Sequence, residues 1–153
     1  MIYLKKYRLL YPENCGHKAY NLGKLIKIGL RVPNSFVIPT EIYFHHINEI
    51  KFPNSEQELH LFQKQIVKKQ IDRKFSHRLK DLFEEFSKNN LLPIAVRSSS
   101  QAEDRDGKSS AGLYSSVLNI KSYKNFIESI KKCWSSYWSI EAYIYREKNN
   151  ISN

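Results

Sequence analysis

The first helix signal lies near the N-terminus, where apolar residues recur at the spacing of one helix face. Leu22, Leu25 and Ile26 carry this pattern. Gly29 follows them, at the place where a helix commonly ends on a residue with left-handed backbone. The pattern therefore predicts a helix that opens near Lys18 and ends at about residue 28.

A short strand and a second helix are predicted directly after this helix. Pro33 disfavours helical backbone at Val32, so the chain should be extended there. The apolar run at 35–38 is typical of a short strand, and the Thr40 side chain can cap a helix that runs to about Asn48.

The middle of the chain carries a strong helical period. Apolar residues recur every three to four positions between residues 56 and 88, with an interruption near Asp72. They are Leu59, Phe62, Ile66, Phe75, Leu79, Leu82, Phe83 and Phe86. Two amphipathic helices, or one bent helix, fit this pattern equally well.

Two short apolar runs, at 91–96 and 117–120, predict strands on either side of a long Ser/Gly-rich loop. Ser122 can then cap one long helix. Its apolar residues are Phe126, Ile127, Ile130, Trp134, Trp138 and Ile144. These elements predict an α/β (α+β) fold in which helices flank a mixed sheet. At 153 residues, without a repeat or linker, the chain is expected to form a single domain over residues 1–153.

The charge balance favours anionic partners. The chain has 25 Lys and Arg against 15 Asp and Glu, a formal charge of +10, which suits nucleotides, nucleic acids or acidic membranes. No apolar run approaches the ~20 residues needed to span a bilayer. Cys15 and Cys133 lie far apart and no signal peptide precedes them, so a cytoplasmic location is expected.

Nucleic-acid binding is disfavoured by the arrangement of the aromatic residues. Ten tyrosines and two tryptophans on a basic chain could stack on single strands. Trp134 and Trp138, however, fall four apart on one helical face beside Ile127 and Ile130, which indicates a place in the core. Metal binding is disfavoured as well, because none of the five histidines is in a ligand-spaced pair with a second pair nearby.

The stretch AVRSSSQAEDRDGKSSAGLYSSVLNI at 95–120 is the strongest candidate for chemistry. It delivers Arg97 from an apolar run into a loop of small residues, whose amides can approach an anion closely. The planar guanidinium of arginine can contact two phosphate oxygens at once. A nucleotide polyphosphate is the predicted ligand, and a structural ion pair of Arg97 with Glu103 or Asp104 is the alternative.

Three motifs together resemble a known family. They are GHKAYNLGKLIKIGLRVPNSFVIPTEIY, the Arg97 stretch with its Val-Arg-Ser-Ser, Ala-Glu-Asp and Ala-Gly elements, and CWSSYWSIEAYIYREKNNI. In this order they resemble the nucleotide-binding domain of the phosphoenolpyruvate synthase (pyruvate, water dikinase) and pyruvate phosphate dikinase family. The resemblance spans essentially the whole chain and is weakest at 50–90.

The resemblance implies an ATP site. It implies that Lys18 and Arg97 contact the phosphates of ATP and that a loop covers them. The loop residues are Ser110, Ala111, Gly112, Leu113, Tyr114 and Ser115. Lys18 also suits this role physically, because a lysine at a helix start adds an ammonium charge to the unsatisfied amides of the first turn. Two departures from the family pattern are His17, in place of a second glycine, and Ser115, in place of an acidic or amide residue.

The resemblance also implies what lies outside this chain. By this resemblance, the chain corresponds to the first lobe of an ATP-grasp fold. Three further parts are expected on a separate chain or a missing continuation: a second lobe that carries the Mg²⁺ ligands, a phosphohistidine domain, and a barrel that handles pyruvate. The predicted function is the ATP-binding portion of a pyruvate, water dikinase-like phosphotransferase that transfers a phosphoryl group to a histidine supplied elsewhere. The alternative is a non-catalytic remnant or regulatory nucleotide-binding module.

Overall fold

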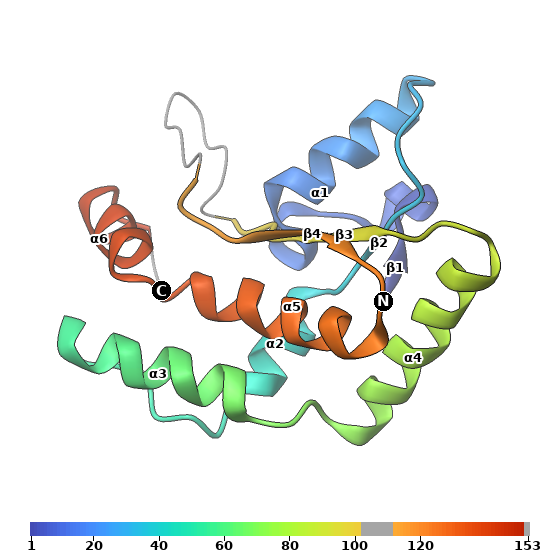
Figure 1. Ribbon diagram of the computed structural model, residues 1–153. Coiled ribbons are helices and arrows are strands. Elements are labelled where there is room, and N and C mark those ends of the chain that lie inside the picture. Colours follow the sequence, from blue (N-terminus) through green and yellow to red (C-terminus); the bar gives the residue numbers. More distant parts are fainter. Residues whose placement is uncertain (102–111, 152–153) are drawn as a thin grey trace. The chain divides into compact units, whose positions relative to one another are not determined.

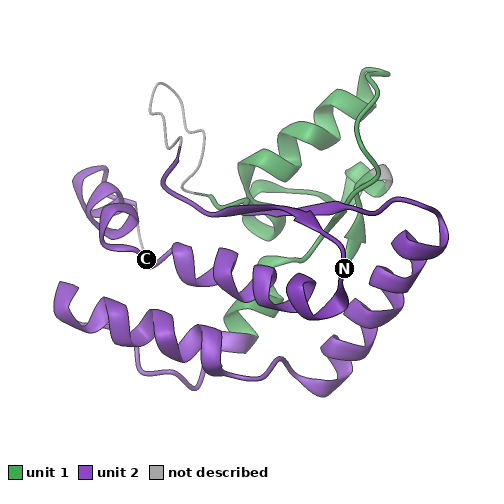
Figure 2. Ribbon diagram, viewed as in Figure 1, with its two compact units in different colours: residues 1–45, 99–111 green, residues 46–98, 112–153 purple. Residues whose placement is uncertain are grey.

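The structure is a computed structural model that describes residues 1–101 and 112–151. It contains both helices and short strands, which confirms the mixed α/β class (Figure 1). The prediction of one mixed sheet is wrong for the described residues, whose strands form two separate two-stranded antiparallel sheets. The chain packs as two compact units (Figure 2). Unit 1 comprises residues 1–45 and 99–111, and unit 2 comprises residues 46–98 and 112–153.

Unit 1 is built around one kinked helix and a small sheet. Its elements are β1 (Ile2–Tyr3), the 3-10 helix η1 (Leu4–Leu9), α1 (Pro12–Lys27), β2 (Phe36–Val37) and most of α2 (Thr40–Ile47). β1 and β2 pair antiparallel, with Ile2 opposite Val37. The Thr40 hydroxyl, expected to cap α2, instead donates to the Glu13 carbonyl at 2.9 Å. Thr40 therefore ties α2 to α1.

The apolar core of unit 1 lies between α1, η1 and the strands. Its buried members are Leu4, Leu10, Cys15, Ala19 and Val37. Gly23 allows this packing to be close, because a Cβ at that position would lie 3.2 Å from side-chain atoms of Leu10 and Tyr7.

The C-terminal end of α1 confirms the predicted helix end at Gly29. Gly29 has φ +82°, and hydrogen bonds from Gly29 to Ile26 and from Leu30 to Leu25 complete a Schellman cap.

Unit 2 packs helices against a two-stranded hairpin. Its elements are α3 (Glu56–Lys68), α4 (Arg73–Lys88), β3 (Ile94–Arg97), β4 (Ser116–Ile120), α5 (Tyr123–Ser136) and α6 (Ile140–Lys148). β3 and β4 pair antiparallel, with a register shift between Ile94 and Val96. One face of the hairpin packs on α5, which in turn contacts α3 and α4.

The periodicity at 56–88 is confirmed as two helices. All eight apolar residues of that pattern are buried. The break falls at Asp72, whose side chain accepts a hydrogen bond from the Phe75 amide at 3.1 Å and so caps α4. The two helices bury one stripe each and leave their charged faces exposed.

The prediction of one long helix after Ser122 is wrong beyond residue 136. Ser122 does cap α5, accepting from the Asn125 amide, but the helix stops and α6 begins after Ser139. The Ser139 hydroxyl accepts from the Ala142 amide at 3.2 Å. Burial of Trp138, which meets the Phe62 ring edge-on at 4.8 Å, accompanies this break.

Arg146 fills the centre of the corner between α5 and α6. It is fully buried, its guanidinium carbon lies 3.8 Å from the centre of the Tyr137 ring, and Nη1 donates to the Tyr137 and Ala142 carbonyls. A buried cation is stabilised both by a position over an aromatic face and by hydrogen bonds to carbonyls. Among the residues that the structure describes, no helix is both long and apolar enough to cross a membrane.

We predict that Ser139→Ala lowers the free energy of unfolding by about 1 kcal/mol, because the cap of α6 is lost. Ser55→Ala is the matched control, since Ser55 holds the N-cap position of α3 without a side-chain cap bond. Urea denaturation followed by circular dichroism measures both variants. An equal loss in the two variants would contradict the assigned cap.

Candidate functional site

Residues from two of the three motifs that carry the resemblance meet at the kink of α1, and all the residues in this contact belong to unit 1. Gly16 has φ 73° and ψ 165°, which interrupts the helix so that a new helical segment starts after it. The His17 amide donates to the Ser100 carbonyl at 3.2 Å. The Ala19 amide donates to Ser99 Oγ at 2.9 Å. Residues from the second motif therefore satisfy the first turn of the helix that carries Lys18.

Gly16 is required at this contact by two independent constraints. Its φ and ψ lie in a region that is essentially restricted to glycine. A Cβ at Gly16 would also lie 2.1 Å from the Ser99 carbonyl oxygen, far inside van der Waals distance. The backbones at Gly16 and Ser99 are thus in direct contact, and no larger residue fits without movement of one of them.

Two further hydrogen bonds complete the contact. Ser99 Oγ donates to the Cys15 carbonyl at 2.7 Å, and Gln101 Nε2 donates to the Glu13 carbonyl at 3.1 Å. The 99–101 segment thereby binds α1 on both sides of the kink.

The Lys18 side chain is half-buried. In the sequence Lys18 lies between His17 and Ala19, whose amides donate hydrogen bonds to the 99–101 segment. The helix-start prediction is confirmed, since the second helical segment does open there. The expectation that the first-turn amides are unsatisfied is wrong for His17 and Ala19, because Ser100 and Ser99 accept from them. Anion binding at this point would depend on the Lys18 ammonium group more than on those two amides.

Cys15 has a structural role in this contact. It is buried, and its Sγ donates to the Tyr11 carbonyl at 3.0 Å. Burial raises the pKa of the Cys15 thiol to about 11. The thiol therefore stays protonated at neutral pH, which is unsuited to nucleophilic chemistry.

Arg97 ends β3 with its side chain exposed. It forms no ion pair with a described residue; its possible partners Glu103 and Asp104 lie outside the described residues. The register places Ser116 directly opposite Arg97, so both side chains project from the same face of the hairpin. Sequence reasoning did not select Ser116, because only the strand register brings it beside Arg97.

The predicted covering loop is described in part. Ser110 and Ala111 lie outside the described residues, whereas Gly112, Leu113, Tyr114 and Ser115 lie within them. Gly112 has φ +80°, as its expected left-handed backbone requires. Its added Cβ would meet nothing within 4 Å, so the backbone there is open to approach.

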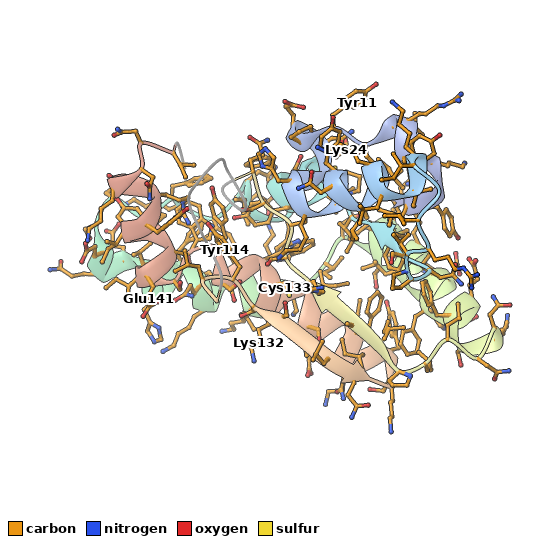
Figure 3. All side chains as sticks on the ribbon, turned by 90° about the horizontal axis from the view of Figure 1, so that it is seen from above. Tyr11, Lys24, Tyr114, Lys132, Cys133 and Glu141 are labelled. Carbon is orange, nitrogen blue, oxygen red and sulfur yellow. The ribbon has the colours of Figure 1, made fainter. Side chains whose placement is uncertain are left out.

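The base of this loop is held by α5. The Ser115 amide donates to Ser136 Oγ at 2.9 Å, and Cys133 Sγ donates to the Ser115 carbonyl at 3.2 Å. Tyr114 and Cys133 are both labelled in Figure 3 and both are buried. Ser115 therefore uses its backbone for anchoring, which fixes the last residue before β4.

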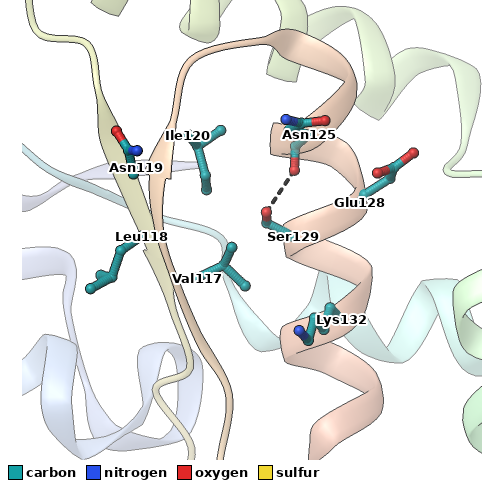
Figure 4. Close-up of a pocket in the computed structure, with 8 residues that line it drawn as sticks. All are labelled: Val117, Leu118, Asn119, Ile120, Asn125, Glu128, Ser129 and Lys132. Carbon is teal, nitrogen blue, oxygen red and sulfur yellow. Dashed lines mark hydrogen bonds between the residues drawn. The ribbon is translucent and has the colours of Figure 1, made fainter.

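A depression of about 250 Å³ lies beside β4 and α5 (Figure 4). It is lined by Val117, Leu118, Asn119, Ile120, Asn125, Glu128, Ser129 and Lys132. None of these is a predicted phosphate-binding residue, and Ser129 bonds internally to the Asn125 carbonyl at 2.6 Å. Within the described ranges, no group of three or more His, Cys, Asp or Glu side chains could hold a metal ion.

Sequence reasoning missed the residues that join the motifs. In the sequence, Gly16 belongs to the first motif and the serines of Val-Arg-Ser-Ser belong to the Arg97 stretch, and nothing in either motif indicates that they meet. The available signal was the glycine at the start of a helix whose own sequence offers no Ser, Thr or Asp cap near Lys18. Such a helix start needs its hydrogen-bond acceptors from elsewhere in the chain.

We predict that Gly16→Ala destabilises the chain by more than about 2 kcal/mol, because strained backbone and a steric clash with Ser99 act together. Gly29→Ala is the matched control: Gly29 also has positive φ, but its Cβ would meet nothing within 4 Å, so we expect about 1 kcal/mol. Thermal or urea unfolding compares the two. A smaller loss at Gly16 than at Gly29 would argue against the close backbone contact.

We predict that Cys15 resists alkylation by iodoacetamide at pH 8. With a pKa of about 11, only about one thiol in a thousand is ionised at that pH, and the thiolate is the reactive form. Peptide mass spectrometry should show modification of Cys15 at least about tenfold slower in the folded chain than in denaturant. Equal rates in the two conditions would contradict the burial of this thiol.

Comparison with known proteins identifies several relatives. The chain is 37% identical over 140 residues to the uncharacterized phosphotransferase YvkC of Bacillus subtilis, covering 88% of this chain and 16% of that protein. It is 29% identical over 160 residues to a phosphoenolpyruvate synthase of Aeropyrum pernix, covering 90% and 19%. It is 30% identical over 159 residues to a rifampicin phosphotransferase of Bacillus cereus, covering 90% and 18%.

The chain thus spans less than a quarter of the length of each of these relatives. The model of one protein family, described as the pyruvate phosphate dikinase, AMP/ATP-binding domain, matches residues 12–153. This match includes the kink of α1, the 99–101 segment and the β3–β4 hairpin. The chain therefore belongs to the pyruvate phosphate dikinase AMP/ATP-binding domain family.

Proposed function

We propose that this chain is the first lobe of an ATP-grasp-type domain and holds the phosphates of ATP in a pyruvate, water dikinase-like phosphotransferase. The observation that carries the proposal is the contact of the 99–101 segment with the kink of α1. This contact joins the motif of Lys18 to the motif of Arg97, which precedes Ser99 by two residues.

Lys18 would bind phosphate oxygens through its ammonium group. It lies in the first turn of a helical segment, where the helix dipole adds a positive potential for anions. Its backbone is fixed by the engaged amides on either side. A lysine with an ordered backbone loses less conformational entropy when it binds a ligand than one on a loose loop.

Arg97 would supply a second phosphate contact. Its exposed guanidinium can donate two parallel hydrogen bonds to a phosphate, and the hydroxyl of Ser116 across the hairpin can donate a third. The segment Ser110–Ser115 would cover the phosphates, with Gly112 allowing its amide to come close. The anchored backbone of Ser115 would fix one end of that cover.

Bound ATP would supply the phosphoryl group, and the chemistry would be completed by groups from outside this chain. Phosphoryl transfer needs Mg²⁺ and an acceptor in line with the leaving oxygen. Following the resemblance to the dikinase family, we place the Mg²⁺ ligands in a second lobe and the acceptor histidine in a phosphohistidine domain. A cytoplasmic location follows from the proposed use of ATP.

We predict that Lys18→Ala and Arg97→Ala each weaken ATP binding by about 10- to 100-fold, because each removes a charge-assisted hydrogen bond. Isothermal titration calorimetry with ATP and Mg²⁺ measures the dissociation constants. Lys27→Ala, on an exposed turn of α1, and Arg78→Ala, on an exposed face of α4, are the matched controls. Lys24, which is labelled in Figure 3, is less suitable, since its ammonium group lies 4.9 Å from the centre of the Tyr20 ring.

The controls should bind ATP within about twofold of the unmodified chain, because salt screens the attraction between ATP and an exposed charge that does not contact it. The site assignment would be wrong if Lys18→Ala and Arg97→Ala bound ATP as tightly as these controls. A uniform weakening by all four substitutions would indicate general charge attraction in place of a defined site.

A further inference from the structure

Ser99 caps a helix that is distant from it in sequence. An N-cap side chain normally belongs to the residue just before its helix. Here the acceptor for the Ala19 amide comes from a residue 80 positions further along the chain. The helical segment that carries Lys18 therefore depends on a tertiary contact for its first turn.

One hydroxyl bridges the two sides of the kink. Ser99 Oγ donates to the carbonyl of Cys15, before Gly16, and accepts from the amide of Ala19, after it. Both distances, 2.7 and 2.9 Å, are those of well-formed hydrogen bonds. Lys18 lies inside the stretch that this hydroxyl spans, so the direction of the Lys18 side chain depends on the bridge.

The Ser99 side chain is committed to the protein backbone. A serine hydroxyl has one donor hydrogen, and the Cys15 carbonyl takes it. Ser99 therefore has no hydrogen left to donate to a phosphate while the bridge is intact. Its contribution to a phosphate site would be made through Lys18.

We propose that Ser99 is a positioning residue for the phosphate site, whose hydroxyl holds the kink of α1 in the conformation that aims the Lys18 ammonium group at phosphate. This inference rests on the proposed function, because Lys18 must bind phosphate for Ser99 to act through it. The steric contact at Gly16 sets the distance between the backbones, and the Ser99 hydroxyl sets the orientation of the helical turn.

The test is a double-mutant cycle on ATP binding, measured by calorimetry on the whole chain with Mg²⁺. Ser99→Ala should weaken ATP binding by about tenfold, because the Lys18 ammonium group is then no longer held in the orientation that contacts phosphate. Ser99→Thr keeps the hydroxyl and should restore binding to within about threefold. In a Lys18→Ala background, Ser99→Ala should change the dissociation constant by less than about twofold, because the group it positions is absent.

Ser35→Ala is the matched control. The Ser35 hydroxyl also donates to a backbone carbonyl of unit 1, that of Pro33 at 2.8 Å, so this variant removes a comparable bond away from Lys18. It should leave ATP affinity unchanged. Amide hydrogen exchange provides an independent readout: exchange at Ala19 should accelerate in Ser99→Ala and stay slow in Ser99→Thr.

The outcomes separate the two proposals. If Lys18→Ala alone leaves ATP affinity unchanged, the proposed phosphate contact of Lys18 and this inference are both overturned, and if Arg97→Ala also leaves it unchanged, the proposed function is overturned with them. If Lys18→Ala weakens binding and Ser99→Ala does not, or weakens it equally with and without Lys18, only the positioning role is overturned. Should the alanine variant be too unstable to measure, Ser99→Cys, with its weaker hydrogen-bonding group, allows the same comparison in both backgrounds.

Discussion

The close approach of the Ser99 carbonyl to Gly16 is the constraint on which the candidate site depends. A backbone contact of this kind needs a glycine, and the φ and ψ of Gly16 exclude other residues independently. Once the two backbones meet, the hydrogen bonds at Glu13, Cys15, His17 and Ala19 can all form to the 99–101 segment. The kink that would weaken an isolated helix becomes the place where another motif is bound.

This arrangement explains how a helix can start well without a local cap. The first-turn amides of a helix need acceptors, and an uncapped start is costly when it is buried. The sequence before Lys18 offers a cysteine, a glycine and a histidine in place of the usual capping residues. Because the acceptors come from Ser99 and Ser100, folding of this helix start and docking of the second motif are linked.

The hairpin in unit 2 has a comparable dependence on α5. Ser136 and Cys133 bond the amide and carbonyl of Ser115, and these bonds fix the base of the predicted covering loop. The buried Arg146 supports the corner that follows α5, through aromatic and carbonyl contacts. A basic chain with a charge of +10 thus uses one arginine for packing, while Arg97 stays exposed at a strand end.

The sequence by itself determined the elements whose signals are local. The apolar stripes of α3 and α4, the cap at Ser122 and the left-handed glycine at 29 act within a few residues, so periodicity and side-chain chemistry were sufficient to predict them. Near Asp72 the sequence indicated only an interruption, and the structure identifies that residue as the cap of α4. The break before α6 was missed, because the apolar spacing continues through Trp138 and the cap at Ser139 opposes it only locally. The tertiary structure alone decided the role of Ser99, the pairing of Arg97 with Ser116 and the use of the Thr40 hydroxyl. These features join residues far apart in the chain, and no local pattern records which distant groups will meet.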